Sequence, residues 1–352
     1  MKRIITNLIV FVLLAFSTIQ AQTVFTVTKT SDPDPFIYSS NPDDPEIEGT
    51  LQWAIRKANE TAGPCIIVFN IPGSGQQVIY LNYELPLITK EVTIDGTTQP
   101  GYAFGNPTVK VDGQGLLNSG FQNYNSPLII KGLQISNFQY HGIYLYNGDY
   151  SFVLENVFTG IINPDEVSAT MGIRFVMSDN STIKGNIFGL DPENNIGQEI
   201  ESYGILFQAS YYGLVGGTGF HEANTITNCN SRGVFLDKSQ FIKISGNSIY
   251  NNPIAIFLGA SSNQFIQPPV INSYVDGTLS GVAVPNSFIE IFGSIGNENA
   301  NEYITTTTSN ASGYWTTSIS VNSFNYCIAT VTNETNNTSN LSNAVFSQIP
   351  TV

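Results

Sequence analysis

Charged residues are scarce in this sequence, and cations are the scarcer of the two. Only 11% of the 352 residues are charged, and 13 Lys and Arg stand against 27 Asp and Glu, which gives a formal net charge of −14. Nucleic acids and anionic membrane surfaces are bound by clusters of basic residues, so neither is an expected partner. With 41% hydrophobic residues, the composition also excludes a coiled coil or a disordered chain and favours an all-β protein.

Cysteine is also rare. Cys65, Cys229 and Cys327 are odd in number and far apart in the sequence. This pattern does not predict a disulfide framework, even in an oxidising compartment. Each cysteine is therefore expected to be a small buried apolar residue.

Only one long hydrophobic run is present, near the first residue. Lys2 and Arg3 precede an apolar run from Leu8 to Phe16, and small and polar residues including Ala21 follow it. The pattern is typical of a secretory signal peptide and is short for a membrane span. Residues 1–22 are predicted to be a signal peptide, with an uncleaved anchor as the alternative. The mature protein is expected to be secreted or on the cell surface, without membrane insertion.

Glycine is abundant, at 31 residues, and much of it lies in two interleaved repeats. The first repeat is an apolar residue, a variable residue and then Gly or a polar pair ending in Asn. Its copies are Ile94-Asp95-Gly96, Val111-Asp112-Gly113, Ile130-Lys131-Gly132, Val153-Leu154-Glu155-Asn156, Ile183-Lys184-Gly185-Asn186, Leu214-Val215-Gly216-Gly217 and Ile244-Ser245-Gly246-Asn247. The second repeat comprises Gly142-Ile143-Tyr144-Leu145, Gly172-Ile173-Arg174-Phe175, Gly204-Ile205-Leu206-Phe207, Gly233-Val234-Phe235-Leu236 and a weaker copy, Ala255-Ile256-Phe257-Leu258.

These repeats predict a parallel β-helix. Each unit is a short strand, a turn and another short strand, which cannot bury its apolar face alone, whereas stacked coils pair every strand with its equivalents. Alternation along a strand points the apolar residues on either side of the variable one inward. Asn recurs at one turn and is expected to bond coil to coil; the residues are Asn156, Asn186, Asn224 and Asn247.

Both ends of the repeat region carry other patterns. Thr50 is a good helix N-cap, and Leu51, Ala54, Ile55 and Ala58 give one apolar stripe, so residues 50–61 are predicted to be a helix that caps the β-helix. The β-helix domain is expected over residues 23–267. After Pro268-Pro269 the repeats stop, and short alternating strands predict a small β-sandwich over residues 268–352.

Several motifs resemble secreted bacterial right-handed parallel β-helix repeat proteins of the pectin-lyase-like superfamily. The segments that carry the resemblance are Gly49 to Asn59 (GTLQWAIRKAN), Ile94 to Tyr102 (IDGTTQPGY), Lys131 to Ile135 (KGLQI) and Val215 to Gly217. The tail is similar to bacterial Ig-like modules, at Gly281 to Pro285 and Asn337 to Ser339. The resemblance implies the right-handed fold and export, but fold alone does not imply an activity.

Catalytic chemistry has weak candidates in this sequence. Glycoside hydrolases need paired carboxylates, and the acidic doublets here, Asp43-Asp44 and Asp165-Glu166, do not match the pattern of the hydrolases with this fold. A polysaccharide lyase needs a base and a positive charge beside the uronate carboxylate. Lys131, Lys184 and Arg174 are the candidates for that role, with solvated surface cations as the alternative.

A calcium site is a further hypothesis. Asp95 and Asp112 occupy the same place in two copies of the first repeat, so they are expected on adjacent coils about 5 Å apart. Two carboxylates this close repel unless they are neutralised, and Ca²⁺ prefers oxygen ligands. The alternative is that each Asp-Gly pair simply forms a turn. His221-Glu222 is a weaker metal signal, more typical of a surface loop.

The variable residue of the second repeat is expected to face outward and to form a mostly apolar row on successive coils. Its members are Tyr144, Arg174, Leu206, Phe235 and Phe257. Such a row rarely faces water on a soluble monomer. It is either a platform for sugar rings, with Arg174 as a hydrogen-bond donor, or a surface covered by a loop or by the C-terminal sandwich.

The preferred interpretation is an exported protein that binds glycans without catalysis, in binding or adhesion at the cell exterior, with an extracellular polysaccharide as its partner. The alternative is a polysaccharide lyase or hydrolase acting on uronate-containing polymers. A structural spacer is the third hypothesis. An enzyme would release products from the polymer, a binder would retain the polymer uncut, and a spacer would do neither.

Overall fold

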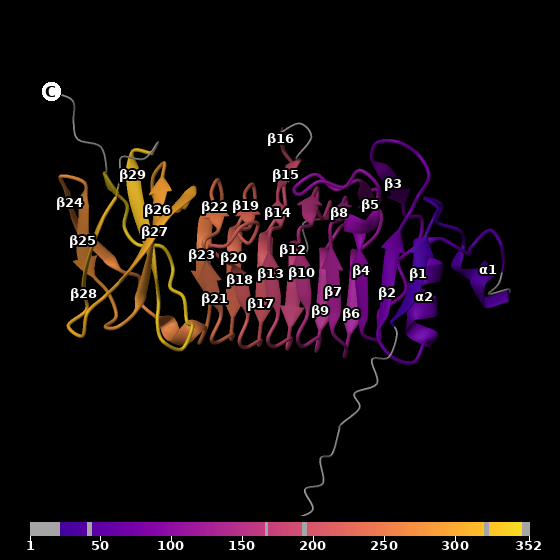
Figure 1. Ribbon diagram of the computed structural model, residues 1–352, viewed down its shortest axis with the longest axis horizontal. Helices are drawn as coiled ribbons and strands as arrows, with labels where there is room; N and C mark the ends of the chain where they lie inside the picture. Colours follow the sequence, from indigo (N-terminus) through magenta and orange to yellow (C-terminus); the bar gives the residue numbers. More distant parts are fainter. Residues whose placement is uncertain (1–21, 41–43, 166–167, 192–195, 320–323, 347–352) are drawn as a thin grey trace, which may run out of the picture.

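The computed structural model describes residues 22–40, 44–165, 168–191, 196–319 and 324–346. The signal-peptide prediction falls on residues 1–22, of which only the last is described. Three parallel sheets contain most of the strands, and their strands follow one another along the long axis (Figure 1). From residue 92 to residue 258 the chain visits the three sheets in turn, so each circuit is one coil. This arrangement confirms the predicted parallel β-helix.

Sheet A runs in the order β1 (Thr23–Val27), β2 (Cys65–Phe69), β4 (Val92–Asp95), β7 (Leu128–Lys131), β10 (Phe152–Leu154), β13 (Thr182–Lys184), β18 (Leu214–Gly216) and β21 (Lys243–Ser245). Sheet B consists of β3 (Gln77–Tyr80), β5 (Val109–Asp112), β8 (Gln134–Ser136), β11 (Val157–Thr159), β14 (Ile187–Phe188), β19 (Thr225–Ile226) and β22 (Ser248–Ile249). Sheet C consists of β6 (Ser119–Tyr124), β9 (His141–Tyr146), β12 (Met171–Val176), β17 (Tyr203–Gln208), β20 (Arg232–Asp237) and β23 (Ile254–Leu258). A short hairpin, β15 (Leu190–Asp191) and β16 (Ile196–Gly197), leaves the coils.

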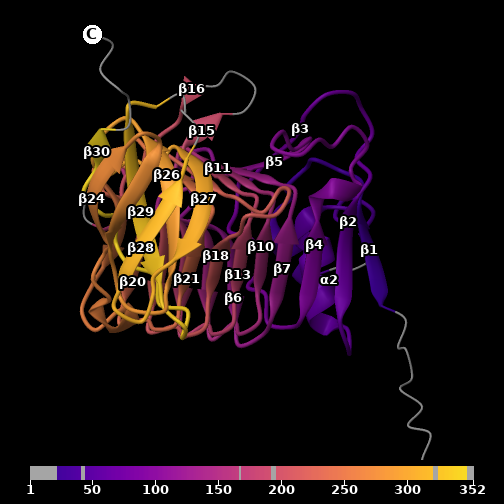
Figure 2. The ribbon, with the colours of Figure 1, turned by 60° about the vertical axis from the view of Figure 1, so that its left-hand side comes forward.

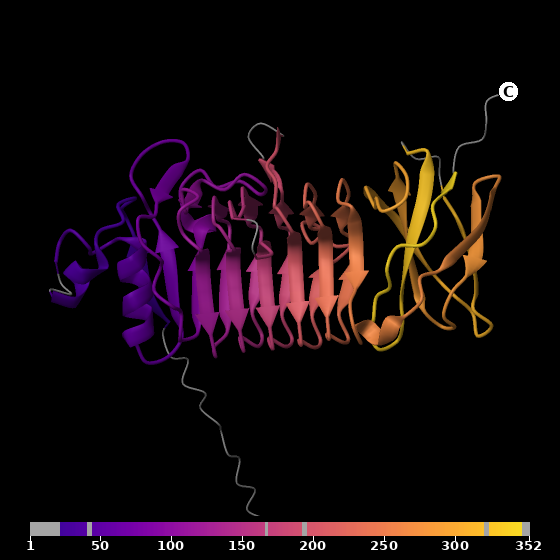
Figure 3. The same ribbon diagram turned by 180° about the vertical axis from the view of Figure 1, so that it is seen from behind.

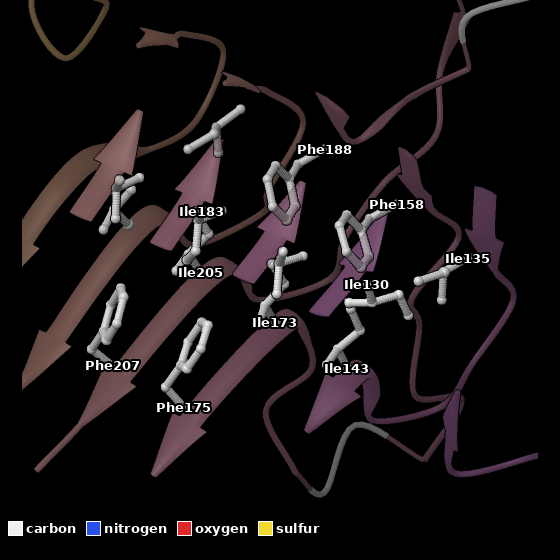
Figure 4. Close-up of a cluster of buried hydrophobic side chains, with 14 of the residues drawn as sticks. Ile130, Ile135, Ile143, Phe158, Ile173, Phe175, Ile183, Phe188, Ile205 and Phe207 are labelled. Carbon is white, nitrogen blue, oxygen red and sulfur yellow. The ribbon is translucent and has the colours of Figure 1, made fainter. Parts of the chain in front are cut away.

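Side chains that point into the coils stack on their equivalents (Figure 4). Phe175 lies flat against Phe207, and Phe158 against Phe188, each pair with ring centroids 4.7 Å apart. These rings are fully buried, as are the isoleucines of the same rows. The apolar residues predicted to face inward therefore do so, and the core is a set of columns along the helix axis.

The predicted asparagine ladder is confirmed at the turn between sheets A and B. The Oδ1 of Asn186 accepts from the backbone N–H of Asn156 (2.9 Å), and the Oδ1 of Asn224 accepts from the N–H of Asn186 (2.9 Å). Asn247 continues the ladder by accepting from the N–H of Asn224 (3.0 Å). All four side chains are buried. The amides thus satisfy backbone groups that water cannot reach.

The first coil is covered by a helix, as the sequence predicted. Helix α2 (Leu51–Glu60) begins after Thr50, whose hydroxyl accepts from the N–H of Trp53, and its apolar stripe is buried. The helix packs on β1 and β2, at the end of the molecule opposite the C-terminal residues (Figure 1). Short helical segments occur elsewhere as α1 (Pro35–Ser40), η1 (Gly96–Thr98) and η2 (Asn263–Phe265). In the described part of the chain, no helix is long and apolar enough to cross a membrane.

Two antiparallel sheets follow β23, at the other end of the molecule (Figures 2 and 3). One sheet has the order β24 (Val270–Val275), β25 (Thr278–Val282) and β28 (Tyr314–Ser318), and the other β27 (Glu302–Thr308), β26 (Phe288–Ser294), β29 (Tyr326–Thr332) and β30 (Val345–Phe346). We call these two sheets the sandwich. An immunoglobulin-like topology stays a prediction.

One equivalence drawn from the sequence is wrong. The Val111-Asp112-Gly113 unit lies on β5 in sheet B, whereas the other copies of the first repeat end strands of sheet A. On sheet A, β4 pairs directly with β7, which places Asp95 opposite Lys131. The local pattern recurs because strands of both sheets alternate and then turn.

The three cysteines are buried, as expected.

Candidate functional site

The five residues predicted to form an outward row do so on sheet C. The strand register places Tyr144 opposite Arg174, and Arg174 opposite Leu206. Leu206 is then opposite Phe235, and Phe235 opposite Phe257. Because their neighbours along each strand point into the coil, these side chains share the outer surface of the sheet. We call this surface the aromatic face.

The row is only partly shielded from solvent. Leu206 is 5% exposed, so it is buried between its neighbours, whereas Tyr144, Arg174, Phe235 and Phe257 are all half-buried. Neither a loop nor the sandwich therefore covers these four side chains completely. In this row the structure leaves three rings and one guanidinium within reach of a ligand.

A second row, which the sequence interpretation missed, adds a second arginine to the aromatic face. It consists of the residues that precede glycine in the second repeat, and the register places His141 opposite Met171, Met171 opposite Tyr203, and Tyr203 opposite Arg232. The recurring place of these residues before glycine was the available signal. Their polarity varies, so no periodic pattern marked them.

Arg232 lies against three aromatic rings. Its guanidinium carbon is 4.3 Å from the ring centroid of Phe257, 4.9 Å from that of Phe235 and 5.3 Å from that of Tyr203. Its Nη1 donates to the hydroxyl of Tyr203 (3.1 Å). A guanidinium stacked in this way is held by cation–π attraction and keeps a fixed orientation.

Arg174 is held by a ring and an amide on neighbouring coils. Its guanidinium carbon lies 5.5 Å from the ring centroid of Tyr144, and its Nη2 donates to the Oε1 of Gln208 (2.8 Å). The Nε atoms of Arg174 and Arg232 are both buried without a hydrogen-bond partner. Within the described residues, no acidic side chain comes within ion-pair distance of either guanidinium. In this part of the chain, the aromatic face therefore carries two guanidinium groups that are in no ion pair.

Tyrosines and a histidine gather at the β6–β9 end of the aromatic face. The ring of Tyr144 lies 5.8 Å from that of Tyr124 and 5.1 Å from that of His141. The Nδ1 of His141 is 3.1 Å from the hydroxyl of Ser119. Burial, helped by the charge of Arg174, lowers the pKa of His141 to about 3, so the imidazole is neutral at physiological pH.

The other catalytic candidates lie on a different sheet. Lys131 and Lys184 are on sheet A, with Leu154 between them, and Arg174 is on sheet C. The Nζ of Lys131 is 3.0 Å from a carboxylate oxygen of Asp95. The Nζ of Lys184 is 2.8 Å from the Oε1 of Glu222, and the hydrogen bond from Lys184 lowers the pKa of that carboxyl. The three cations therefore form no common cluster, and each lysine is ion-paired.

The geometry proposed for a calcium site is not present. Asp95 ends β4 in sheet A and Asp112 ends β5 in sheet B, so the two carboxylates do not stack. Each has its own cation, since Lys110 lies 3.0 Å from Asp112 just as Lys131 pairs with Asp95. Within the described ranges, no group of three or more His, Cys, Asp or Glu side chains could hold a metal ion.

His221, the other weak metal candidate, lies in a stack of rings. Its imidazole is sandwiched between Phe104 and Phe220, with centroid distances of 3.6 and 3.7 Å. The adjacent Glu222 carboxylate faces Lys184 rather than a metal-binding partner. The pair thus belongs to a loop that lies against the turn between sheets A and B.

Residues 119–265 match the family model described as "Right handed beta helix region", so this part of the chain is a right-handed β-helix. No curated protein matches the chain. Among solved structures, the enzymatically active domain of tailspike protein 2 from bacteriophage CBA120 is similar at 10% identity and a TM-score of 0.33, over 82% of this chain and 65% of that domain. The tailspike protein gp49 of Acinetobacter baumannii bacteriophage Fri1, described as a capsular polysaccharide depolymerase, is 11% identical with a TM-score of 0.16, over 94% of this chain and 87% of that one. The chain thus spans slightly less than two thirds of the first of these structures.

Proposed function

We propose that this chain is an exported protein that binds a glycan along the aromatic face of sheet C without cleaving it. The observation that carries the proposal is the continuous row from Tyr144 to Phe257, in which half-buried rings are combined with Arg174. The apolar faces of sugar rings pack on aromatic side chains, and a few fixed polar groups then set orientation. The proposal includes export, which depends on the predicted signal peptide.

The dimensions of the row favour an extended ligand. Tyr144 and Phe257 are separated by four strand pairings, so they lie about 19 Å apart at a strand spacing of ~4.8 Å. This length fits several linked sugars aligned with the helix axis rather than a single sugar. The ligand class is therefore an oligosaccharide segment of a longer polysaccharide.

The two arginines favour a glycan that carries negative groups. Arg174 and Arg232 have no acidic partner within the described residues, in a chain whose net charge is −14. Their guanidinium groups are oriented by rings and amides before any ligand arrives, and a guanidinium matches a carboxylate or sulfate in charge and geometry. Binding should then weaken as salt is raised.

The test compares Tyr144→Ser/Phe235→Ser with the unchanged protein on a panel of immobilised acidic and neutral polysaccharides. We expect retention of an acidic polymer to be lost in the double variant, while its melting temperature stays within a few degrees of the parent. The matched control is Tyr314→Ser, which removes an exposed ring from the sandwich and should leave retention unchanged. Equal retention by the double variant, or loss of retention in the control, would contradict the proposal.

Product analysis distinguishes binding from catalysis in the same samples. Release of unsaturated or reducing ends would show a lyase or hydrolase and overturn the non-catalytic part of the proposal. No retention and no release on any polymer would leave only the spacer hypothesis.

Arg174→Gln/Arg232→Gln is expected to reduce retention of acidic polymers and to remove the salt dependence of that retention, with retention of neutral polymers unaffected.

A further inference from the structure

The sandwich supplies hydrogen-bond partners to the last coil. In the other coils, the next coil supplies these partners. The backbone N–H of Phe241 donates to the Oδ1 of Asn337 (2.8 Å), and that of Ile244 donates to the Oγ1 of Thr338 (2.9 Å). Ile249 and Ala300 exchange two backbone hydrogen bonds of 2.8 Å. Because unpaired strand edges are costly when buried and prone to aggregate when exposed, these contacts make the sandwich the C-terminal cap of the β-helix.

One acidic side chain is buried in this junction. Glu290 on β26 is 6% exposed, and its carboxylate accepts hydrogen bonds from the hydroxyl of Ser245 and from the backbone N–H of Gly246 (2.9 Å). Both donors belong to the last coil. Burial raises the pKa of this carboxyl, and the two hydrogen bonds and the charge of Lys243 offset the rise only in part.

Beyond these two donors, Glu290 faces one cation and two threonines. Lys243 on β21 is the charged group that faces it from the coil, and the residues opposite it on β27 and β29 are Thr306 and Thr330. The hydroxyl of Thr330 is buried without a hydrogen-bond partner. A void of about 10 Å³ lined by Ser245 and Thr330 lies in the same junction, and this is room for one water molecule at most.

We propose that the junction between the β-helix and the sandwich is proton-sensitive, with Glu290 as the group that strengthens the docking when it is protonated. A neutral carboxyl still accepts from the N–H of Gly246, and it no longer places a charge in the interface. Because the pKa of Glu290 is higher in the folded protein than its ordinary value of 4.5, the folded state binds more protons. Its contribution is complete below pH 4.5 and is lost as the pH rises through the raised pKa.

The test uses the full chain and Glu290→Gln. Glutamine can accept from Gly246 and donate to Ser245 at every pH, so it imitates the neutral carboxyl. We expect the melting temperature of this variant to exceed that of the parent at pH 8 and to converge with it at pH 4.5. The matched control is Glu302→Gln on the exposed side of β27. This variant should show the same difference in melting temperature between pH 8 and pH 4.5 as the parent.

A second variant and a local measurement keep the outcome unambiguous. Ser245→Ala removes one donor to the carboxylate, so it should raise the pKa of Glu290 further. The fall in melting temperature with rising pH should then extend to higher pH than in the parent. Hydrogen exchange of the Gly246 and Ile249 amides, corrected for intrinsic rates, should show weaker protection at pH 8 than at pH 5 in the parent and equal protection in Glu290→Gln. Equal pH dependence of melting in the parent and in Glu290→Gln would overturn the proposal.

Discussion

Replacing Asn186 by alanine tests whether the asparagine ladder holds the coils together. Its Nδ2 donates to the carbonyl of Val153 (2.8 Å), and its Oδ1 accepts from the backbone N–H of Asn156 (2.9 Å). Both partners lie on the preceding coil. Alanine supplies neither group, and the site is closed to water because Asn156 and Asn186 are fully buried.

The cost follows from the two backbone groups that lose their partners. A buried donor or acceptor left unsatisfied costs about 1–3 kcal/mol, so the carbonyl of Val153 and the N–H of Asn156 together predict a loss of about 4 kcal/mol. Folded domains are stable by about 5–15 kcal/mol in total. A single substitution in the ladder is therefore expected to remove a large part of the stability of the β-helix.

Urea unfolding followed by far-ultraviolet circular dichroism measures this loss. Asn70→Ala is the matched control, because Asn70 is exposed just after β2, and exposed substitutions usually change stability by under about 0.5 kcal/mol. If Asn186→Ala lost no more than the control, the cost of burying the amides would equal the gain from their hydrogen bonds. The ladder would then specify the register of the coils without stabilising them.

Two further substitutions examine the core and one turn. Phe175→Ala removes a fully buried ring from its stack and is expected to cost about 3–5 kcal/mol in urea unfolding; a cost under about 1 kcal/mol would show that the column does not depend on this ring. Asp149→Asn addresses the pKa of Asp179, which burial and then the neighbouring Asp149 charge raise. A raised folded pKa costs stability at neutral pH, so the variant should lower that pKa and stabilise the fold by under about 1 kcal/mol at pH 7. An unchanged titration of Asp179 by NMR would contradict this.

The inner surface of the β-helix could be predicted because every coil must bury apolar side chains and satisfy backbone groups at equivalent positions. Ile143 and Ile173 occupy equivalent places in copies of one repeat, so one alternation fixed the direction of both. Asn156 and Asn186 recur for the same reason, since both satisfy the same backbone groups at the same turn. The place of a residue within a repeat therefore predicts its place in the coil.

The same reasoning fails where loops change the length of a coil. Asp95 and Asp112 end strands of similar sequence, but a loop separates them within a single circuit rather than a whole coil. Local patterns of an alternating strand followed by a turn are alike in sheets A and B. The strand pairings assign each strand to its sheet, since β4 pairs with β2 and β7 in sheet A, and β5 with β3 and β8 in sheet B. These pairings depend on the length of the loop.

Arg232 and Glu290 were missed for a different physical reason. Outward side chains are free to differ from coil to coil, so no repeat marks Arg232 as part of the aromatic face. Glu290 contacts Gly246 across 44 residues of sequence, and nothing in the strand around it indicates which surface it will meet. Long-range polar contacts become visible only when the two partners are placed in space.

The division between inner and outer surfaces explains why this fold can carry binding sites at little cost in stability. Inward residues such as Phe207 and Asn186 are constrained by two neighbouring coils, and changing them removes core packing or buried hydrogen bonds. Outward residues meet solvent on one side, so a row such as Tyr144 to Phe257 can change while the columns beneath stay intact. An uncompensated cation like Arg232 is costly for folding unless rings hold it. Phe235 and Phe257 hold this guanidinium on the aromatic face, where an acidic group of the proposed ligand can reach it.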